Sequence, residues 1–196
     1  MLALVEPHPS PKAYLEQYTI PVDAAAEMLF VAAYINADII GKTVADLGCG
    51  TGRLAIGAAV LGAKETVGVD IDKTATKLAK KNAEKTGVDE KTQWLVADID
   101  ALRGTFDTVL QNPPFGVQKR RADRKFLLKS LELASRVYSL HKGGESNREF
   151  IKRFIEGQKG KVTGIFPMTL VIPKMFGFHT KTKYKVDVDL YRIEKE

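Results

Sequence analysis

A short apolar run, a glycine-rich loop and a helix follow one another in this chain, and they restrict its fold more than any other feature. Thr43 to Leu47 is an apolar run of the kind found in strands buried in parallel sheets. Gly48 to Gly52 supplies three glycines, and apolar periodicity predicts a helix from Arg53 to Leu61. Glycines let the backbone approach a ligand closely, and a helix start directs N–H groups toward it. The stretch therefore predicts an α/β sheet with a nucleotide-like ligand at the carboxyl end of this strand.

The spacing of the glycines argues against a dinucleotide as that ligand. It reads G-x-G-x-G instead of G-x-G-x-x-G, and Asp46 lies two residues before the first glycine. An acid there would repel a pyrophosphate but suits a ligand with a positive centre, an ammonium or a sulfonium. Asp70 ends the next expected strand, Glu65 to Asp70, where a carboxylate can accept both hydroxyls of a ribose. For Asp72, close by, an N-cap of the following helix is the favoured interpretation.

Apolar runs and alternation predict strands over the rest of the chain, and apolar residues at helical spacing predict helices. The other expected strands run from Thr92 to Ala97, Phe106 to Leu110 and Arg136 to His141, with an antiparallel pair at Val162 to Leu170 and Tyr184 to Ile193. The other expected helices run from Asp23 to about Ile40, about Lys73 to Thr86, Phe126 to Ser135 and about Asn147 to Glu156. We expect a single domain over residues 1–196, with an N-terminal arm and helix at 1–41 and a core that carries the site at 42–196.

Composition narrows the class of protein. Lys and Arg number 30 against 24 Asp and Glu, and a formal charge of +6 favours an anionic partner, nucleic acid first, over a merely basic protein. The single cysteine, Cys49, excludes an internal disulfide and a cysteine-based zinc site, and it suits a reducing cytoplasm. No apolar run approaches ~18 residues, so no membrane span is expected. The proline-containing start lacks a basic region and is not expected to be a signal peptide.

The sequence N-P-P-F at Asn112 to Phe115 follows the apolar run Phe106 to Leu110. Prolines lack an N–H group, so the strand must end at Asn112, and the stiff exit leaves carbonyls free. The Asn112 amide oxygen and the Pro113 carbonyl could together accept both hydrogens of a planar NH2 group, while Phe115 stacks on the ring that carries it. Taken alone, N-P-P also suits an ordinary strand-ending turn that Pro114 stiffens. The glycine loop upstream favours a site.

Two basic stretches are candidates for contacts with nucleic acid. The first, at 116–125, contains Lys119, Arg120, Arg121 and Arg124, and it is either a clamp on phosphates or a solvated loop. The second, at 176–183, interleaves rings and cations in a way that suits single-stranded or looped RNA. Its candidate residues are Phe178, His179, Lys181 and Lys183.

The glycine loop and N-P-P-F together make the chain resemble the Rossmann-like fold of S-adenosylmethionine-dependent methyltransferases, in the branch that methylates planar amino nitrogens. The resemblance implies a seven-stranded, mostly parallel sheet of order 3-2-1-4-5-7-6 with a C-terminal antiparallel hairpin. Over nearly the whole chain it is similar to the small-subunit ribosomal RNA adenine-N6 methyltransferases. The stretches that carry this similarity are Leu15 to Tyr18, Val69 to Asp72, Asn112 to Gly116, Val137 to Lys142, Phe178-His179 and Val186 to Leu190.

That family implies S-adenosylmethionine as the cofactor and an adenine N6 atom of structured RNA as the methyl acceptor, with no metal. The implied cofactor contacts are Gln17, Gly48, Thr51, Arg53, Asp70 and Asp98, with Ala97 alongside. Asp46, Gly50 and Gly52 are also expected to contact the cofactor, because they belong to the glycine loop or precede it. Asp98 is placed to hydrogen-bond an adenine amine. A threonine contact of the eukaryotic proteins aligns with Ile20, and Thr19 is adjacent.

The family also implies a protein partner, a small zinc-ribbon activator. In the implied strand order, Gln93 to Ala97 is the edge of the sheet, and Trp94, Leu95 and Val96 make it apolar. Proteins normally protect such edges, so we expect either a helix to cover it or the partner to add a strand there.

Other functions remain open on residues alone. N-P-P also serves enzymes that methylate a protein glutamine, and the fold could persist in a non-catalytic RNA-binding assembly factor. DNA adenine methylation and protein glutamine methylation would each call for an additional recognition domain, and only 45 residues precede Asp46.

Overall fold

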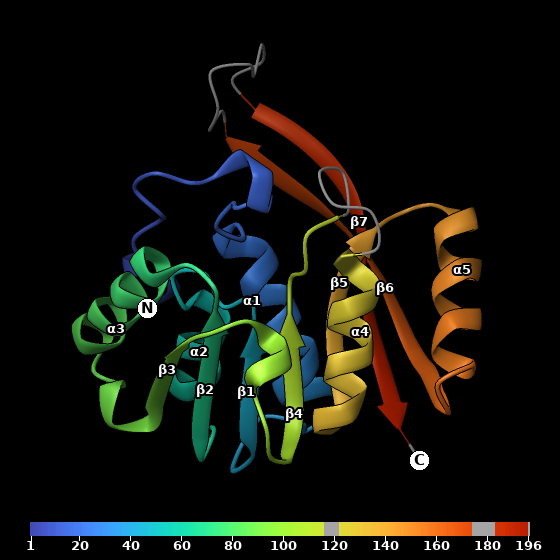
Figure 1. Cartoon of the computed structure of the whole chain (residues 1–196), viewed down its shortest axis with the longest axis horizontal. Coiled ribbons are helices and arrows are strands. Elements are labelled where there is room, and N and C mark those ends of the chain that lie inside the picture. The colour runs from blue at the N-terminus through green and yellow to red at the C-terminus, as the bar shows by residue number, and fades with distance from the viewer. Residues whose placement is uncertain (116–121, 174–182, 196) are drawn as a thin grey trace.

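The computed structural model describes residues 1–115, 122–173 and 183–195. They form one seven-stranded sheet of order β3-β2-β1-β4-β5-β7-β6, which confirms the predicted topology (Figure 1). β1 to β5 are parallel, and β7 lies antiparallel between β5 and β6. The strands are β1 (Thr43–Leu47), β2 (Glu65–Asp70), β3 (Thr92–Val96), β4 (Phe106–Gln111), β5 (Ala134–Lys142), β6 (Gly160–Pro173) and β7 (Lys183–Lys195).

Helices cover both faces of this sheet, which is why most residues of its central strands β1 and β4 are buried. Adjacent residues of one strand belong to different cores: Val44 to the core that includes residues of α1 and α2 on one face, and Ala45 to the core that includes residues of α4 and α5 on the other. The helices are α1 (Val22–Phe30), α2 (Arg53–Val60), α3 (Lys73–Thr86), α4 (Ala122–Leu133) and α5 (Glu145–Glu156), with short helical turns η1 (Leu2–Leu4), η2 (Ala13–Leu15), η3 (Val31–Ile35), η4 (Asp89–Lys91) and η5 (Ile99–Ala101).

The first predicted helix is wrong at its C-terminal end. It was expected to run to about Ile40, but α1 ends at Phe30 and continues as the π-helical turn η3. The Asn36 side chain donates a hydrogen bond to the carbonyl of Val31 at 2.9 Å, and Ala37 turns the chain out of the helix with a φ of 56°.

Other boundaries differ by a few residues. A helix was predicted from Phe126 to Ser135, whereas α4 begins four residues earlier, at Ala122. It ends at Leu133 because β5 starts at Ala134. α5 begins at Glu145 because Gly144, with a φ of 118°, makes the turn that precedes it. β6 and β7 pair over a longer stretch than predicted.

Parallel pairing brings several candidate residues to one edge of the sheet. Leu47 at the end of β1 is in register with Val69 and Gln111, and Asp70 at the end of β2 is in register with Val96. The segments after these strands therefore meet above the arrowheads in Figure 1, beneath the N-terminal arm. Within the described ranges, no helix is long and apolar enough to cross a membrane.

Candidate active site

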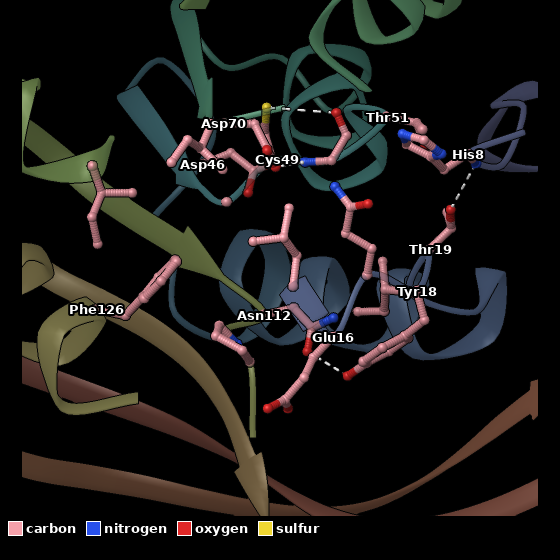
Figure 2. A pocket seen from close by; sticks show the side chains of 18 of the residues that line it. His8, Glu16, Tyr18, Thr19, Asp46, Cys49, Thr51, Asp70, Asn112 and Phe126 are labelled. Atoms are coloured by element: carbon pink, nitrogen blue, oxygen red, sulfur yellow. Dashed lines mark hydrogen bonds between the residues drawn. The ribbon is translucent and has the colours of Figure 1, made fainter. Parts of the chain in front are cut away.

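A cavity of about 240 Å³ opens at this edge, and Figure 2 shows residues of the strand ends and of the N-terminal arm facing it. Eleven of the predicted residues line it: Gln17, Asp46, Gly48, Gly50, Thr51, Arg53, Asp70, Ala97, Asp98, Asn112 and Pro114. Gly52, Pro113 and Phe115 do not line it. The structure thus brings the glycine loop and the start of N-P-P-F to one space.

The second and third glycines of the loop, Gly50 and Gly52, have different surroundings. Gly50 has a φ of 53°, and a Cβ added there would have no atom within 4 Å, so its backbone borders open space. A Cβ on Gly52 would instead come within 2.5 Å of the ring of Trp94. Gly50 leaves room for a ligand, whereas Gly52 lets the helix α2 pack closely on β3.

Two buried carboxylates are oriented by backbone N–H groups. Asp46 is 1% exposed and accepts from the N–H of Ala55 at 3.0 Å, and burial raises the pKa of its carboxyl to about 7. Asp70 accepts from the N–H groups of Gly50 and Asp72, each at 2.8 Å, and burial raises its pKa as well. These hydrogen bonds fix where both carboxylates point.

Asp72 fastens the N-terminal arm to the sheet and also caps α3, as predicted. One of its oxygens accepts from the N–H of Thr74 at 2.8 Å. The other accepts from the amide of Gln17 at 3.0 Å and lies 2.9 Å from the ammonium of Lys12. Burial acts to raise the pKa of Asp72, but the bonds from Lys12 and Gln17 outweigh it and hold that pKa well below its usual range. The side-chain nitrogen of Gln17 is therefore directed at Asp72.

Arg53 holds the arm at two further points. Its guanidinium donates to the backbone carbonyls of Ile20 and Val5. The side chain of Arg53 therefore holds the arm. Its backbone, at the start of α2, faces the cavity.

Three buried polar atoms of cavity-lining residues have no hydrogen-bond partner within the described part of the chain: Nε2 of His8, Oγ1 of Thr51 and Nε of Arg53. Nε2 of His8 lies 3.5 Å from Oδ2 of Asp72. Nδ1 of His8 accepts from the N–H of Ser10 at 3.0 Å, so a neutral His8 carries its proton on Nε2. A donor at His8, a hydroxyl at Thr51 and the Asp70 carboxylate fit a ligand that presents hydroxyls, such as a ribose. With the open backbone at Gly50, this set of donors and acceptors fits S-adenosylmethionine.

His8 was not predicted from the sequence. Nothing in the proline-rich first dozen residues indicates that their path crosses the end of β2. Only the bonds from Arg53 and Asp72 show it.

The Asn112 side chain faces the cavity from the end of β4. Its Oδ1 accepts a hydrogen bond from the hydroxyl of Tyr18 at 2.9 Å. The ring of Phe115 lies 6.0 Å from the Tyr18 ring, centroid to centroid, with the planes tilted by 42°. Pro113 is buried at the turn between them. The N-P-P-F segment is thus supported by one residue of the arm.

The remaining candidates lie around this centre. Asp98 accepts from the N–H of Asp100 at 2.9 Å and from Lys125 at 2.6 Å. The guanidinium of Arg124 lies over the ring of Phe150, 4.5 Å from its centroid. Lys183 is exposed at the start of β7. The predicted RNA contacts Lys119, Arg120, Arg121, Phe178, His179 and Lys181 lie outside the described residues.

The predicted edge strand is confirmed as an edge, since β3 ends the sheet. Trp94 points inward and packs on Gly52 and Gly68, whereas Leu95 is 36% and Val96 51% exposed. No covering helix buries these two side chains within the described structure.

Comparison with known proteins places the chain. The ribosomal protein L11 methyltransferase (PrmA) family matches residues 28–113. The rRNA N(6)-adenosine-methyltransferases METTL5 of Danio rerio and Mettl5 of Drosophila melanogaster are each 38% identical, covering 98% and 94% of this chain and 94% and 88% of their own. A crystal structure of a candidate RNA methyltransferase from Pyrococcus horikoshii superposes with a TM-score of 0.92 at 40% identity, covering 99% of this chain and 94% of that one. The family predicted from the sequence is thereby confirmed. The chain belongs to the METTL5-type family of S-adenosylmethionine-dependent rRNA N6-adenosine methyltransferases.

Proposed function

We propose that this protein methylates N6 of an adenine in structured RNA, with small-subunit rRNA as the substrate. The observation that carries the proposal is that the Asn112 amide and the Asp70 carboxylate face one cavity. The first suits a planar amino group and the second a ribose, and relatives similar to this chain over most of their length are named rRNA N6-adenosine methyltransferases.

When bound, S-adenosylmethionine supplies an electrophilic methyl group on a sulfonium centre. Gly50, Thr51, Asp70 and His8 would hold the nucleoside part of this cofactor through the groups described above. The buried carboxylate of Asp46, which also lines the cavity, would favour a positive centre over a neutral one.

The N-P-P-F segment would position the adenine. An adenine must leave its stack to reach a cavity of this kind. Oδ1 of Asn112 and the carbonyl of Pro113 would accept the two N6 hydrogens and orient the nitrogen lone pair toward the methyl group. Stacking on Phe115 would stabilise the extruded base by ~1–3 kcal/mol. Most of the acceleration would come from this positioning, which requires neither a metal nor a covalent intermediate.

The test is to incubate the purified protein with labelled S-adenosylmethionine and total RNA, and in parallel with ribosomal proteins, and then to digest the products. We expect the label in N6-methyladenosine. A label on a glutamine side chain would favour the protein methyltransferase instead, and no label in any fraction would favour a non-catalytic assembly factor. Action on rRNA agrees with the cytoplasmic location predicted from the single cysteine.

For the RNA, we propose contacts from the basic stretches at 116–125 and 176–183. Neutralising Lys119, Arg120 and Arg121 together should reduce the slope of log affinity against log salt, by about 0.7–0.9 for each phosphate that the protein no longer neutralises. Neutralising Lys77, Lys80 and Lys81 on the exposed side of α3 is the matched control. Equal slopes for the two variants would leave the first stretch without a specific role.

For a protein partner, we propose that a small zinc-ribbon activator adds a strand to β3. The exposed Leu95 and Val96 on an edge strand support this proposal. A Val96→Lys variant should fail to co-elute with such a partner after co-expression. Val171→Lys should co-elute like the wild type, because Val171 lies on β6, the opposite edge, and is similarly exposed at 41%. Co-elution of both variants would contradict the proposal.

A further inference from the structure

Tyr18 connects the N-terminal arm to the candidate catalytic segment. It lies between η2 and α1, 94 residues away from Asn112 in sequence, and its hydroxyl donates to Oδ1 of Asn112 at 2.9 Å (Figure 2). Both residues line the same cavity. Since Tyr18 could equally have been part of a capping turn, the sequence alone does not show this contact.

The hydrogen bond from Tyr18 determines the orientation of the Asn112 amide, that is, the positions of its oxygen and its NH2 group. The oxygen and the NH2 group of an amide have nearly the same shape, so their orientation depends on hydrogen-bond partners. A tyrosine O–H that donates to Oδ1 holds the oxygen in place. A carbonyl oxygen has two lone pairs, so Oδ1 can still accept a second hydrogen bond.

The donor is stable in this role. Burial raises the pKa of Tyr18 above its usual value, so the hydroxyl keeps its proton at neutral and mildly alkaline pH. The chain on both sides is held in place, because the side-chain amide of Gln17 donates to Asp72 and the Ile20 carbonyl accepts from Arg53. The Tyr18 ring also contacts Phe115, so one side chain touches both ends of the N-P-P-F segment.

We propose that Tyr18 is a positioning residue for methyl transfer, which fixes the Asn112 amide with its oxygen available to the amino group of the base. The inference rests on the proposed function, because it requires Asn112 to bind that amino group. The alternative is a restraint, in which the Tyr18 hydroxyl competes with the substrate for Oδ1.

The test is Tyr18→Phe, which removes only the hydroxyl and keeps the ring beside Phe115. We expect the single-turnover rate of RNA methylation to fall about 5- to 10-fold, because this is the effect expected when one orienting hydrogen bond is lost. The Kd for S-adenosylmethionine, measured on the free protein by calorimetry, and the KM for RNA should stay within about two-fold. Tyr34→Phe is the matched control, because Tyr34 lies in η3, outside the residues that line the cavity, is 60% exposed and should leave all three values unchanged.

Each other outcome overturns the inference in a distinct way. An unchanged rate would show that Asn112 needs no help from Tyr18, and a raised rate would identify the contact as a restraint. A rate that falls together with cofactor affinity would show that Tyr18 acts by holding the arm over the cofactor. If wild-type protein forms no N6-methyladenosine, the proposed function itself has failed, before any variant is compared.

Discussion

The carboxylate of Asp70 accepts a hydrogen bond from the backbone N–H of Gly50 at 2.8 Å, which ties the end of β2 to the loop after β1. Its other oxygen accepts from the N–H of Asp72, also at 2.8 Å. Asp70 therefore shapes the loop that borders the cavity and presents a negative charge to it.

Replacing Asp70 should weaken the cofactor while leaving the fold in place. Asp70→Asn has one oxygen in place of two, so the N–H of either Gly50 or Asp72 loses its acceptor, and the cavity loses the negative charge that would accept ribose hydroxyls. We expect the Kd for S-adenosylmethionine to rise at least about 10-fold, as for the removal of a hydrogen bond to a charged group. Asp100→Asn, an exposed acid that pairs with Lys125, is the control. Calorimetry that gives equal affinity for wild type and Asp70→Asn would remove the ribose assignment.

Gly50 and Gly52 form a matched pair with opposite predictions. Gly50→Ala puts a methyl group into open space, so it should cost about 1 kcal/mol of stability from its positive φ and weaken the cofactor. Gly52→Ala also places a side chain at a positive φ and in addition collides with Trp94, so it should lower stability by a further 1–3 kcal/mol or so, about the cost of overpacking a core. Denaturant unfolding and cofactor titration of both variants check this. Equal stability losses would contradict the packing role of Gly52.

Most of the fold follows from local patterns in the sequence. The apolar runs at β1, β2 and β4 have no alternation, which indicates strands covered on both faces, and the structure buries them in two cores. The prolines after Asn112 fix the end of β4 to within one residue. The sheet order came from the family resemblance, since pairing between distant strands leaves no local signal.

The N-terminal arm could not be placed from the sequence, because its position depends on single long-range bonds. Arg53 bonds the carbonyls of Val5 and Ile20, and Asp72 bonds Gln17. No local sequence pattern indicates any of these three hydrogen bonds. Without the arm, His8 and Tyr18 have no visible relation to the site. The end of α1 was missed for a similar reason, since a side-chain bond from Asn36 replaces the expected helical turn.

Asp46 should give the protein a pH-dependent stability. Burial raises the pKa of its carboxyl to about 7 from an ordinary value of 3.8, so between these values the folded state holds a proton that the unfolded state has released. The stabilisation is complete below about pH 4 and is lost as pH rises to about 7. Asp46→Asn keeps an acceptor for Ala55 but cannot ionise, so its stability relative to wild type should rise by about 2–4 kcal/mol from pH 4 to pH 8.

Unfolding by urea across this pH range measures the Asp46 effect. Asp89→Asn, an exposed acid in η4, serves as the control and should track the wild type. A constant difference between Asp46→Asn and wild type from pH 4 to pH 8 would show that Asp46 is ionised in the folded protein throughout.

We infer that Asn112 acts on the base and not on the cofactor. The most direct test of this inference is the single-turnover rate of rRNA methylation by Asn112→Ala, measured together with the Kd for S-adenosylmethionine. We predict a rate at least about 100-fold below wild type, because the amino group loses its acceptor and its orientation, and a cofactor Kd within about three-fold of wild type. A rate close to wild type, or a loss of rate that an equal loss of cofactor affinity explains, would contradict the inference.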